Sequence, residues 1–506
     1  MTDFLWETSV LIDAMKARPI GTGLPGGING ISIDSRTVEP GDAFFAIAGD
    51  RFDGHDFLTN ARKAGAALHI VSERRLPALG RLQAPMLVVD DVLAALGRLA
   101  EAARARSKAQ IVAVTGSVGK TTTKEALRHG LAANGASVHA SAASFNNHWG
   151  VPLSLARLPA ETRYAVFEIG MNHPGEIRPL VKLVRPHVAI VTLIAAAHLG
   201  HFRDLDEIAD AKAEIFEGLV TGGTAIVNAD DPKSVKLASI ARSVGVSKVS
   251  TFGEANGADF RLTDFEASAD GATMIAEIAG TTVSVDLAMS GRHFAQNTLA
   301  VLGAASLMGA DVEAVAAELA GWQPVKGRGQ RYHLPMPSGG EIQLFDDSYN
   351  ANPASMRAAI ATLAQARLGE DGRRIAVLGD MKELGGHSHD LHAGLADPLR
   401  EAGVSRLFLV GEEIAPLAQA LAEDDMTVSM HASPKEAQES LLTDMRAGDA
   451  ILVKASRSIG LESVVEALVS RFPPPAKLDV PPAPIQTAEE AAEPQNDDEQ
   501  PENPTR

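Results

Sequence analysis

The stretch AVTGSVGKTTTKEAL, residues 113–127, constrains the fold of this chain most strongly. A strand that leads through a glycine turn into a helix directs backbone N–H groups and the helix N-terminus at one point, which makes an anion site. Lys120 adds a charge for the β- and γ-phosphates, and Thr121 offers a hydroxyl to Mg²⁺. The motif is shortened, since Val114 stands where the standard pattern has its first glycine and the nearest glycine is Gly116. The alternative is a glycine-rich turn with a solvated lysine, but the strand before it and the helix after it favour a nucleoside triphosphate site.

Length and composition limit the class of protein. At roughly 150 residues per domain, 506 residues predict about three domains. The net charge of −18 disfavours a non-specific nucleic-acid surface, and the lack of cysteine excludes disulfides, thiolate metal sites and a cysteine nucleophile. The N-terminus is acidic where a signal peptide is basic, and no apolar run approaches the ~20 residues of a membrane span. We therefore expect a cytoplasmic protein without membrane insertion, and we expect it to be a monomer.

Apolar runs alternate with helical patterns, which is typical of α/β domains with mostly parallel sheets. We expect one α/β domain over 1–108, a central P-loop domain over 109–324 and a third α/β domain over 325–472. The strand candidates are DAFFAIAG, LHIV and MLVV, then IVAVT, YAVFE, VAIVTLI and TAIVN, then IQLFDD, RIAVLGD, RLFLVG and AILVKAS. Segment 473–506 holds nine of the 27 prolines and eight acids against two basic residues, so we expect a disordered tail that is dispensable for chemistry.

Polar residues follow the expected strands of the central part. In open α/β sheets, ligands bind beyond the carboxyl ends of the strands. Glu168 ends YAVFE, His198 follows VAIVTLI, and Asn228, Asp230 and Asp231 come with TAIVN. Oxygen and imidazole ligands beside a P-loop threonine suit Mg²⁺ or Mn²⁺ bound with a polyphosphate. Simpler interpretations remain open, with His198 as an ordinary loop histidine and Asp230 as a turn residue.

Lys212 lies within the apolar face of an expected helix. In DLDEIADAKAEIFEGL, residues 204–219, helical spacing groups Lys212 with Ile208, Ile215 and Phe216. The simplest interpretation is a lysine whose ammonium group reaches out to water. A buried lysine, however, has a lowered pKa, and its neutral amine reacts with electrophiles. Both interpretations stay open on the sequence alone.

A set of motifs in consistent order resembles the Mur ligase family. In the central part these are TGSVGKTT, SFNNHWGVPLS, EIGMNHPGEI, AAHLGHF, AKAEIF, NADD and GRHFAQNTLA. Further on, DDSYNANPASM, GDMKELG and VKASRS resemble the members that add D-alanyl-D-alanine, and SIDSRTVEPGDAFFAIAGDRFDGHDF near the N-terminus resembles their UDP-binding domain. The resemblance runs from about residue 30 to 472. It implies an N-terminal UDP-binding domain, a central ATPase domain and a Rossmann-like C-terminal ligase domain.

The resemblance also implies an ATP-dependent amide ligase. Such an enzyme phosphorylates the terminal carboxylate of UDP-N-acetylmuramoyl-tripeptide, and the amine of D-alanyl-D-alanine then attacks the acyl phosphate. ATP and two Mg²⁺ ions are the implied cofactors, and they stabilise the charge that moves with the γ-phosphoryl group. Two alternatives remain: another ligase of the family, which adds a different amino acid or glutamates to folate, and an ATP-binding assembly protein without catalysis.

Roles for individual residues follow from the same resemblance. Thr121 and Glu168 would serve one Mg²⁺, and His198 a second, together with Lys212 as a carbamate formed from CO₂. The implied catalytic residues are Lys120, Glu168, His198 and Lys212. The residues implied in ATP binding are Gly116, Ser117, Val118, Gly119, Lys120, Thr121, Thr122, Asn297, Arg328 and Asp347. Those implied in substrate binding are Ser35, Arg36, Asn146, Asn147, Asn350, Asn352, Lys454, Ser456 and Arg457.

Two positions depart from the family pattern, and one stretch is rich in histidine. Phe294 stands where the family often has asparagine, and Ala455 stands where it often has glycine. A methyl group at the second position is tolerable unless the backbone needs a positive φ. The stretch HSHDLH, residues 387–392, lacks nearby acids that would complete a tetrahedral zinc site, so we expect a polar helix start there.

Overall fold

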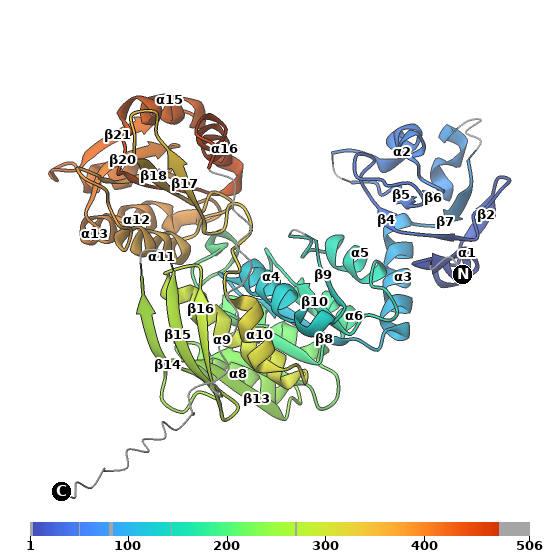
Figure 1. The fold of residues 1–506 in the computed structure, drawn as a ribbon. Helices are drawn as coiled ribbons and strands as arrows, with labels where there is room; N and C mark the ends of the chain where they lie inside the picture. Colours follow the sequence, from blue (N-terminus) through green and yellow to red (C-terminus); the bar gives the residue numbers. More distant parts are fainter. Residues whose placement is uncertain (1–3, 50, 80–83, 143, 269–270, 475–506) are drawn as a thin grey trace, which may run out of the picture.

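The computed structural model describes residues 4–49, 51–79, 84–142, 144–268 and 271–474. Every strand expected from the sequence forms, and the described chain builds three α/β sheets beside a two-stranded sheet of β1 (Trp6–Glu7) and β3 (Gly27–Ile28), so the expected fold class is confirmed. Figure 1 shows the three parts, with the N-terminal part in blue, the central part from cyan to yellow, and the C-terminal part from dark yellow to red. The expected tail lies outside the described residues from 475 onward. Within the described ranges, no helix is long and apolar enough to cross a membrane.

The N-terminal part is built on a five-stranded sheet whose strands, apart from the largely exposed edge strand Arg18–Ile20, are buried on both faces. One face, with Phe44, Val71 and Val88, packs against helix α2 (Leu58–Ala64). The alternate residues of the same strands pack against α3 (Val92–Arg106), as the two-residue period of a strand requires. Only the first strand runs antiparallel to its neighbour. The order is β2 (Arg18–Ile20), β7 (Met86–Val89), β6 (Leu68–Ser72), β5 (Ala43–Phe45) and β4 (Ile31–Ser32).

The N-terminal and central parts share one hydrophobic core. Helices α1 (Thr8–Met15) and α3 contribute to the same buried cluster as α5 (Gly150–Ala156) and α6 (Ile177–Val184) of the central part. The Trp6 indole N–H donates to the Ala156 carbonyl at 2.8 Å, and the Arg106 guanidinium lies 3.3 Å from the centroid of the Trp6 ring. Because separating the two parts would expose this core, we expect them to move as one body.

The central sheet has nine strands and differs from the expectation in one region. Its order is β16 (Thr281–Leu287), β15 (Ala272–Ile278), β14 (Phe260–Ala267), β13 (Lys248–Gly253), β12 (Thr224–Asn228), β11 (Val188–Val191), β8 (Gln110–Thr115), β10 (Tyr164–Glu168) and β9 (Val138–Ala140). The strands from β9 to β14 are parallel, whereas β14, β15 and β16 form an antiparallel meander that was not predicted. The strand expected over 188–194 ends at Val191, because the Leu193 carbonyl accepts the Ser117 N–H at 2.7 Å and the Ile194 N–H donates to Asp231. This turn brings the chain after β11 onto the P-loop.

Helices flank the central sheet and connect its strands. They are α4 (Lys120–Gly130), α5, α6, α7 (Leu205–Ala213), α8 (Ser234–Ser243), α9 (Arg292–Leu307) and α10 (Val312–Leu319). Helix α7 was expected to reach residue 219, but it tightens into a 3₁₀ turn from Glu214 to Gly218.

The C-terminal part is a six-stranded sheet in which only the first strand is antiparallel. Its order is β17 (Gln330–Pro335), β18 (Glu341–Asp346), β22 (Ala450–Lys454), β19 (Arg374–Gly379), β20 (Val404–Val410) and β21 (Thr427–His431). The helices are α11 (Pro353–Ala364), α12 (Ser388–Ala393), α13 (Ala396–Glu401), α14 (Ala415–Ala420), α15 (Pro434–Asp444) and α16 (Glu462–Arg471).

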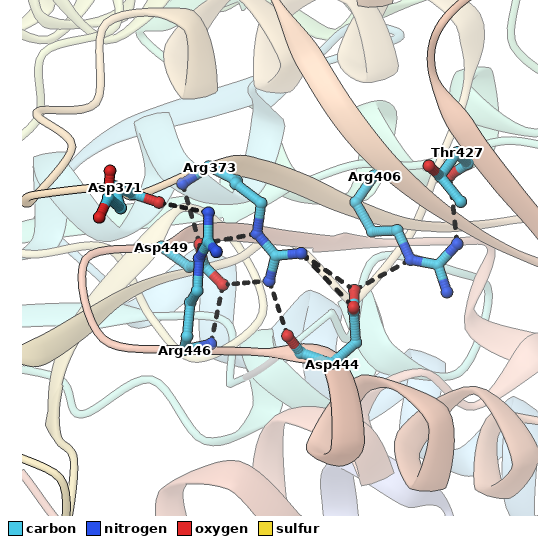
Figure 2. Close-up of polar contacts among 7 residues, drawn as sticks. All are labelled: Asp371, Arg373, Arg406, Thr427, Asp444, Arg446 and Asp449. Atoms are coloured by element: carbon cyan, nitrogen blue, oxygen red, sulfur yellow. Dashed lines mark hydrogen bonds and ion pairs between the residues drawn. The ribbon is translucent and has the colours of Figure 1, made fainter.

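A polar network joins the amino-terminal ends of these strands (Figure 2). The buried carboxylate of Asp449 accepts the backbone N–H groups of Arg373 and Arg446, both at 2.9 Å, and the Arg373 guanidinium at 2.8 Å. Asp444, at the end of α15, accepts the guanidinium groups of Arg373 and Arg406. The network stabilises the end of the sheet that is remote from the candidate site described next.

Candidate active site

The P-loop adopts the strand, turn and helix arrangement that the sequence predicts. Strand β8 ends at Thr115, and α4 begins at Lys120 after the turn 116–119. Gly119 has a φ of 87°, in the left-handed region that favours glycine, and a Cβ there would lie only 2.8 Å from Oδ1 of Asn297. A side chain is therefore excluded at Gly119 both by its backbone and by its neighbour. The N-terminus of α4 faces a cavity of about 550 Å³ at the carboxyl ends of the central strands.

Most of the predicted site residues line this cavity, although they come from two parts of the chain. From the central part these are Ser117, Val118, Gly119, Lys120, Thr121, Thr122, Asn146, Glu168, His198 and Asn297. From the C-terminal part they are Arg328, Asp347, Asn350, Asn352, Lys454 and Arg457. Asn228, which was expected at the same sheet edge, is also a lining residue. The fold thus gathers residues that are more than 300 positions apart in the sequence, from Ser117 to Arg457.

Glu168 lies at the centre of a set of oxygen ligands. Its side chain is buried at 1% exposure. Thr121 Oγ1 donates to one carboxylate oxygen at 2.7 Å, and Asn146 Nδ2 donates to the other at 2.7 Å. These two donors are neutral, so the charge of Glu168 is not neutralised by them. A carboxylate beside a hydroxyl is a hard donor set, so these residues fit a Mg²⁺ ion.

The Lys120 side chain bonds back to the backbone of its own P-loop. Its ammonium group donates to the Gly116 carbonyl at 2.6 Å. Burial lowers the pKa of Lys120, the negative charge of Glu168 raises it, and the positive charge of Arg328 lowers it further. Two cations from different parts of the chain therefore face one cavity, which favours a polyanionic ligand.

Lys212 is buried, at 1% exposure, so the interpretation as a lysine that reaches out to water is wrong. Burial lowers the pKa of Lys212 well below its usual value, and the charge of Lys120 contributes to the shift. We find no ion pair for Lys212 among the residues that the structure describes. Lys212 does not line the cavity. Burial lowers the pKa of the nearby His198 imidazole, and the positive charges of Lys120 and, to a smaller extent, Lys212 lower it further. A neutral amine in this position suits the carbamate that the family resemblance implies.

Tyr349 and Ser144 join the two halves of the cavity, and the sequence analysis did not single them out. Arg328 lies 4.0 Å and Arg457 5.0 Å from the centroid of the Tyr349 ring. The Tyr349 hydroxyl donates to Ser144 Oγ at 2.8 Å, and Arg328 donates to the same oxygen at 3.1 Å. Tyr349 belongs to the motif DDSYNANPASM and Ser144 to SFNNHWGVPLS, so the motifs themselves contained the signal.

Asn352 has both a structural and a positional role. It is the N-cap of α11, where its side chain accepts the Ser355 N–H at 2.9 Å. Its amide also reaches the Ser117 carbonyl of the P-loop, at 3.4 Å. Nearby, Lys454 donates to the Asn350 carbonyl at 2.8 Å, and burial lowers the pKa of Lys454. The C-terminal part thus contacts the P-loop directly.

Some predicted residues lie outside this cavity. Gly116 belongs to the P-loop but is not among the lining residues. Asn147 accepts the Gly150 N–H at the start of α5. Ser456 accepts the Lys382 N–H, and Ser35 and Arg36 lie in the N-terminal part, where Arg36 pairs with Asp34 at 2.6 Å. Their roles in substrate binding stay predictions.

The carboxylates of Asp230 and Asp231 accept backbone N–H groups. Asp231 accepts the Ile194 N–H at 2.6 Å. Asp230 accepts the N–H groups of Glu254 and Ala255, so its carboxylate holds the distant loop after β13 rather than its own turn.

The departures from the family pattern are accommodated by packing. Phe294 is buried and lies against the His293 ring, with centroids 4.2 Å apart. Ala455 is buried, and its φ is not positive, so glycine is not required there. In the histidine-rich stretch, His392 is buried, its Nε2 accepts the Met381 N–H at 2.9 Å, and its Nδ1 bonds the Ser388 carbonyl. This histidine holds the loop that follows β19.

The comparisons with known proteins agree from residue 27 to residue 457. Three families match in order: Mur ligase family, catalytic domain, at 27–104; Mur ligase middle domain, at 114–305; and Mur ligase, glutamate ligase domain, at 327–457. The chain is 38% identical to UDP-N-acetylmuramoyl-tripeptide--D-alanyl-D-alanine ligase of Escherichia coli (strain K12), over 87% of this chain and 94% of that one. The protein of the same name in Bacillus subtilis (strain 168) is 32% identical, over 87% and 93%.

Solved structures of Mur ligases also match this chain. MurF from Acinetobacter baumannii matches with a TM-score of 0.78 and 32% identity, over 92% of this chain and 99% of that one. MurF ligase from Thermotoga maritima, solved in complex with ADP, matches with a TM-score of 0.71 and 27% identity, over 87% and 98%. Since relatives above 30% identity align along nearly their full length, this chain belongs to the Mur ligase family.

Proposed function

We propose that this chain is the ATP-dependent ligase that joins D-alanyl-D-alanine to UDP-N-acetylmuramoyl-tripeptide. The products are the UDP-muramoyl-pentapeptide precursor of peptidoglycan, ADP and phosphate. The observation that carries the proposal is the match to ligases of that name over at least 93% of their length. The cavity supports it, because a P-loop and the motifs of a second domain meet around one space.

In the first step the γ-phosphoryl group of ATP moves to the terminal carboxylate of the tripeptide. The backbone N–H groups of 116–122, together with Lys120 and Arg328, compensate the charge of the phosphates. Thr121 and Glu168 would hold one Mg²⁺, and His198 and carbamylated Lys212 a second. When bound, the ions neutralise the polyphosphate and align it for transfer. Asn297 and Asp347 are the proposed contacts to the nucleoside.

Lys212 reaches its carbamate form through its own chemistry. The neutral amine nitrogen attacks the carbon of CO₂, a C–N bond forms, and the nitrogen releases a proton to water. The neutral amine is thereby replaced by an anion, which the neighbouring positive charge of Lys120 stabilises.

In the second step the amine of the dipeptide attacks the acyl phosphate, phosphate leaves, and the amine loses a proton. Residues of the C-terminal part align the dipeptide with the acyl phosphate, and exclusion of water protects the acyl phosphate from hydrolysis. The proposed dipeptide contacts are Asn350, Asn352, Lys454, Ser456 and Arg457. The proposed contacts to the UDP-tripeptide are Ser35, Arg36, Asn146 and Asn147.

A phosphate-release assay tests the proposed function. We expect release with UDP-N-acetylmuramoyl-tripeptide and D-alanyl-D-alanine together, and none when D-alanine, L-lysine or D-glutamate replaces the dipeptide. Mass spectrometry would identify the pentapeptide product. Turnover with a single amino acid would indicate a different ligase of the family, and nucleotide binding without any turnover would indicate an assembly protein.

A further inference from the structure

The C-terminal part meets the central part at a second place beside the cavity. Glu383, in the loop that follows β19, contacts His198 through its carboxylate and Nδ1 of the ring. The backbone carbonyl of the same residue accepts the Gly200 N–H at 2.8 Å. One residue of the C-terminal part therefore contacts both the side chain and the backbone of the turn at 198–200.

Residues on both sides of this contact have a left-handed backbone conformation. His198 and Glu383 have φ values of 59° and 64°, in the left-handed region that residues other than glycine adopt only at a cost. Gly385 has a φ of 59°, and a Cβ there would lie 2.9 Å from the Gly200 Cα. The two loops thus pack backbone against backbone, which leaves no room for a side chain at Gly385.

The loop that carries Glu383 is held from within its own domain. Met381 N–H donates to the buried His392 at 2.9 Å, and Lys382 N–H donates to Ser456 Oγ at 2.8 Å. The Lys382 ammonium group pairs with the buried carboxylate of Asp380 at 2.8 Å. The position of Glu383 is therefore set by the C-terminal part, and its carboxylate reaches His198 only when that part is docked.

The docking itself depends on polar contacts. Among the described residues, no hydrophobic cluster combines the C-terminal part with the central part, whereas one large cluster joins the central and N-terminal parts. Separating the C-terminal part would therefore expose no shared hydrophobic core, and it would break the contact at His198.

We propose that Glu383 is a positioning residue for His198, which it orients from across the domain boundary. The carboxylate accepts the Nδ1–H, which selects one tautomer and leaves the Nε2 lone pair for the second metal ion. Carboxylates that accept the second N–H of a metal-binding imidazole commonly act in this way. The inference rests on the proposed function, because it assumes that His198 binds metal. It makes completion of the metal site depend on docking of the C-terminal part.

A purely electrostatic role for this pair would be small. The side chains of His198 and Glu383 are 25% and 46% exposed, and ion pairs exposed to water contribute little to stability. Orientation of a metal ligand has a larger effect, about 10- to 100-fold in metal affinity. A measurement of metal affinity therefore distinguishes orientation of His198 from a simple ion pair better than a measurement of stability does.

The experiment measures Mn²⁺ binding by electron paramagnetic resonance on the full chain with a non-hydrolysable ATP analogue. We expect Glu383→Gln to weaken the second Mn²⁺ about tenfold while the first Mn²⁺ and the nucleotide bind as in the wild type. Glu412→Gln is the matched control, since Glu412 is an exposed acid of the same domain, and it should change nothing. His198→Ala should abolish the second site, and adding Glu383→Gln to it should have no further effect.

The outcomes distinguish this inference from the proposed function. If His198→Ala still binds two Mn²⁺ ions, the proposed metal site is wrong. If His198→Ala loses the second ion and Glu383→Gln keeps it at wild-type affinity, the positioning role is refuted while the ligase proposal stands. Weaker binding of the first Mn²⁺ or of the nucleotide when Glu383→Gln is added to His198→Ala would show that Glu383 acts on the fold and would also refute the positioning role.

Discussion

Replacing Gly119 with alanine tests how the P-loop turn is matched to the nucleotide site. The φ of 87° costs an alanine about 1–2 kcal/mol. The new Cβ would also lie 2.8 Å from Oδ1 and 3.1 Å from Nδ2 of Asn297, so the Asn297 amide must move. Gly257 offers a matched control, because its φ is 89° and no described atom lies within 4 Å of an added Cβ.

The two variants should separate stability from binding. Each should lose about 1–2 kcal/mol of unfolding free energy from the backbone alone. Gly119→Ala should in addition displace Asn297 and lose the hydrogen bond to the nucleotide that we propose for this residue. Such a bond contributes about 1 kcal/mol, and with loop distortion we expect a loss of 1–2 kcal/mol, roughly 5- to 30-fold in the Kd of ADP.

Isothermal titration calorimetry with ADP and Mg²⁺ measures the affinity, and thermal unfolding measures the stability. Gly257→Ala should bind ADP as the wild type does. Wild-type ADP affinity in Gly119→Ala, or an equal loss of affinity in both variants, would refute the reasoning that Asn297 is positioned by its contact with Gly119.

The remaining predictions concern catalysis, stability and pH. Lys212→Ala should remove most turnover while the fold persists, and acetate or formate should restore part of the activity; activity close to normal in Lys212→Ala, or rescue by Lys212→Arg, would contradict the carbamate. Asp449→Ala leaves the Arg373 guanidinium without its buried carboxylate partner and should destabilise the C-terminal part by about 3–5 kcal/mol, more than Asp444→Ala, as followed by hydrogen exchange. Burial and the charge of Lys454 lower the pKa of His293 to about 4 from 6.5. Between these two pKa values the unfolded chain binds more protons than the folded chain. The unfolding free energy should therefore fall as the pH falls from 6.5 to about 4, by at most about 3 kcal/mol. Urea titrations at several pH values measure this loss of stability, and it should be smaller in His293→Gln.

Several elements were predictable because their signals are local. The P-loop strand, turn and helix follow from spacing within 15 residues, and the apolar parallel strands from short runs bounded by turns. The antiparallel meander was missed although β15 and β16 alternate buried and exposed residues along ATMIAEI and TTVSVDL. Ala279 and Gly280 between them both have positive φ, as a tight hairpin turn requires, so the alternation and the glycine were the overlooked signal.

The sequence by itself determined the phosphate-binding turn, the strands that position it and the family, because these depend on residue types at fixed short spacings. Only the tertiary structure decided that Lys212 is fully buried, since helical spacing gives the face on which a residue lies but not what covers that face. Only the tertiary structure brought Glu383 to His198, 185 positions away in the chain. A contact of that kind depends on how separately folded parts dock, and no local pattern of residues encodes the docking.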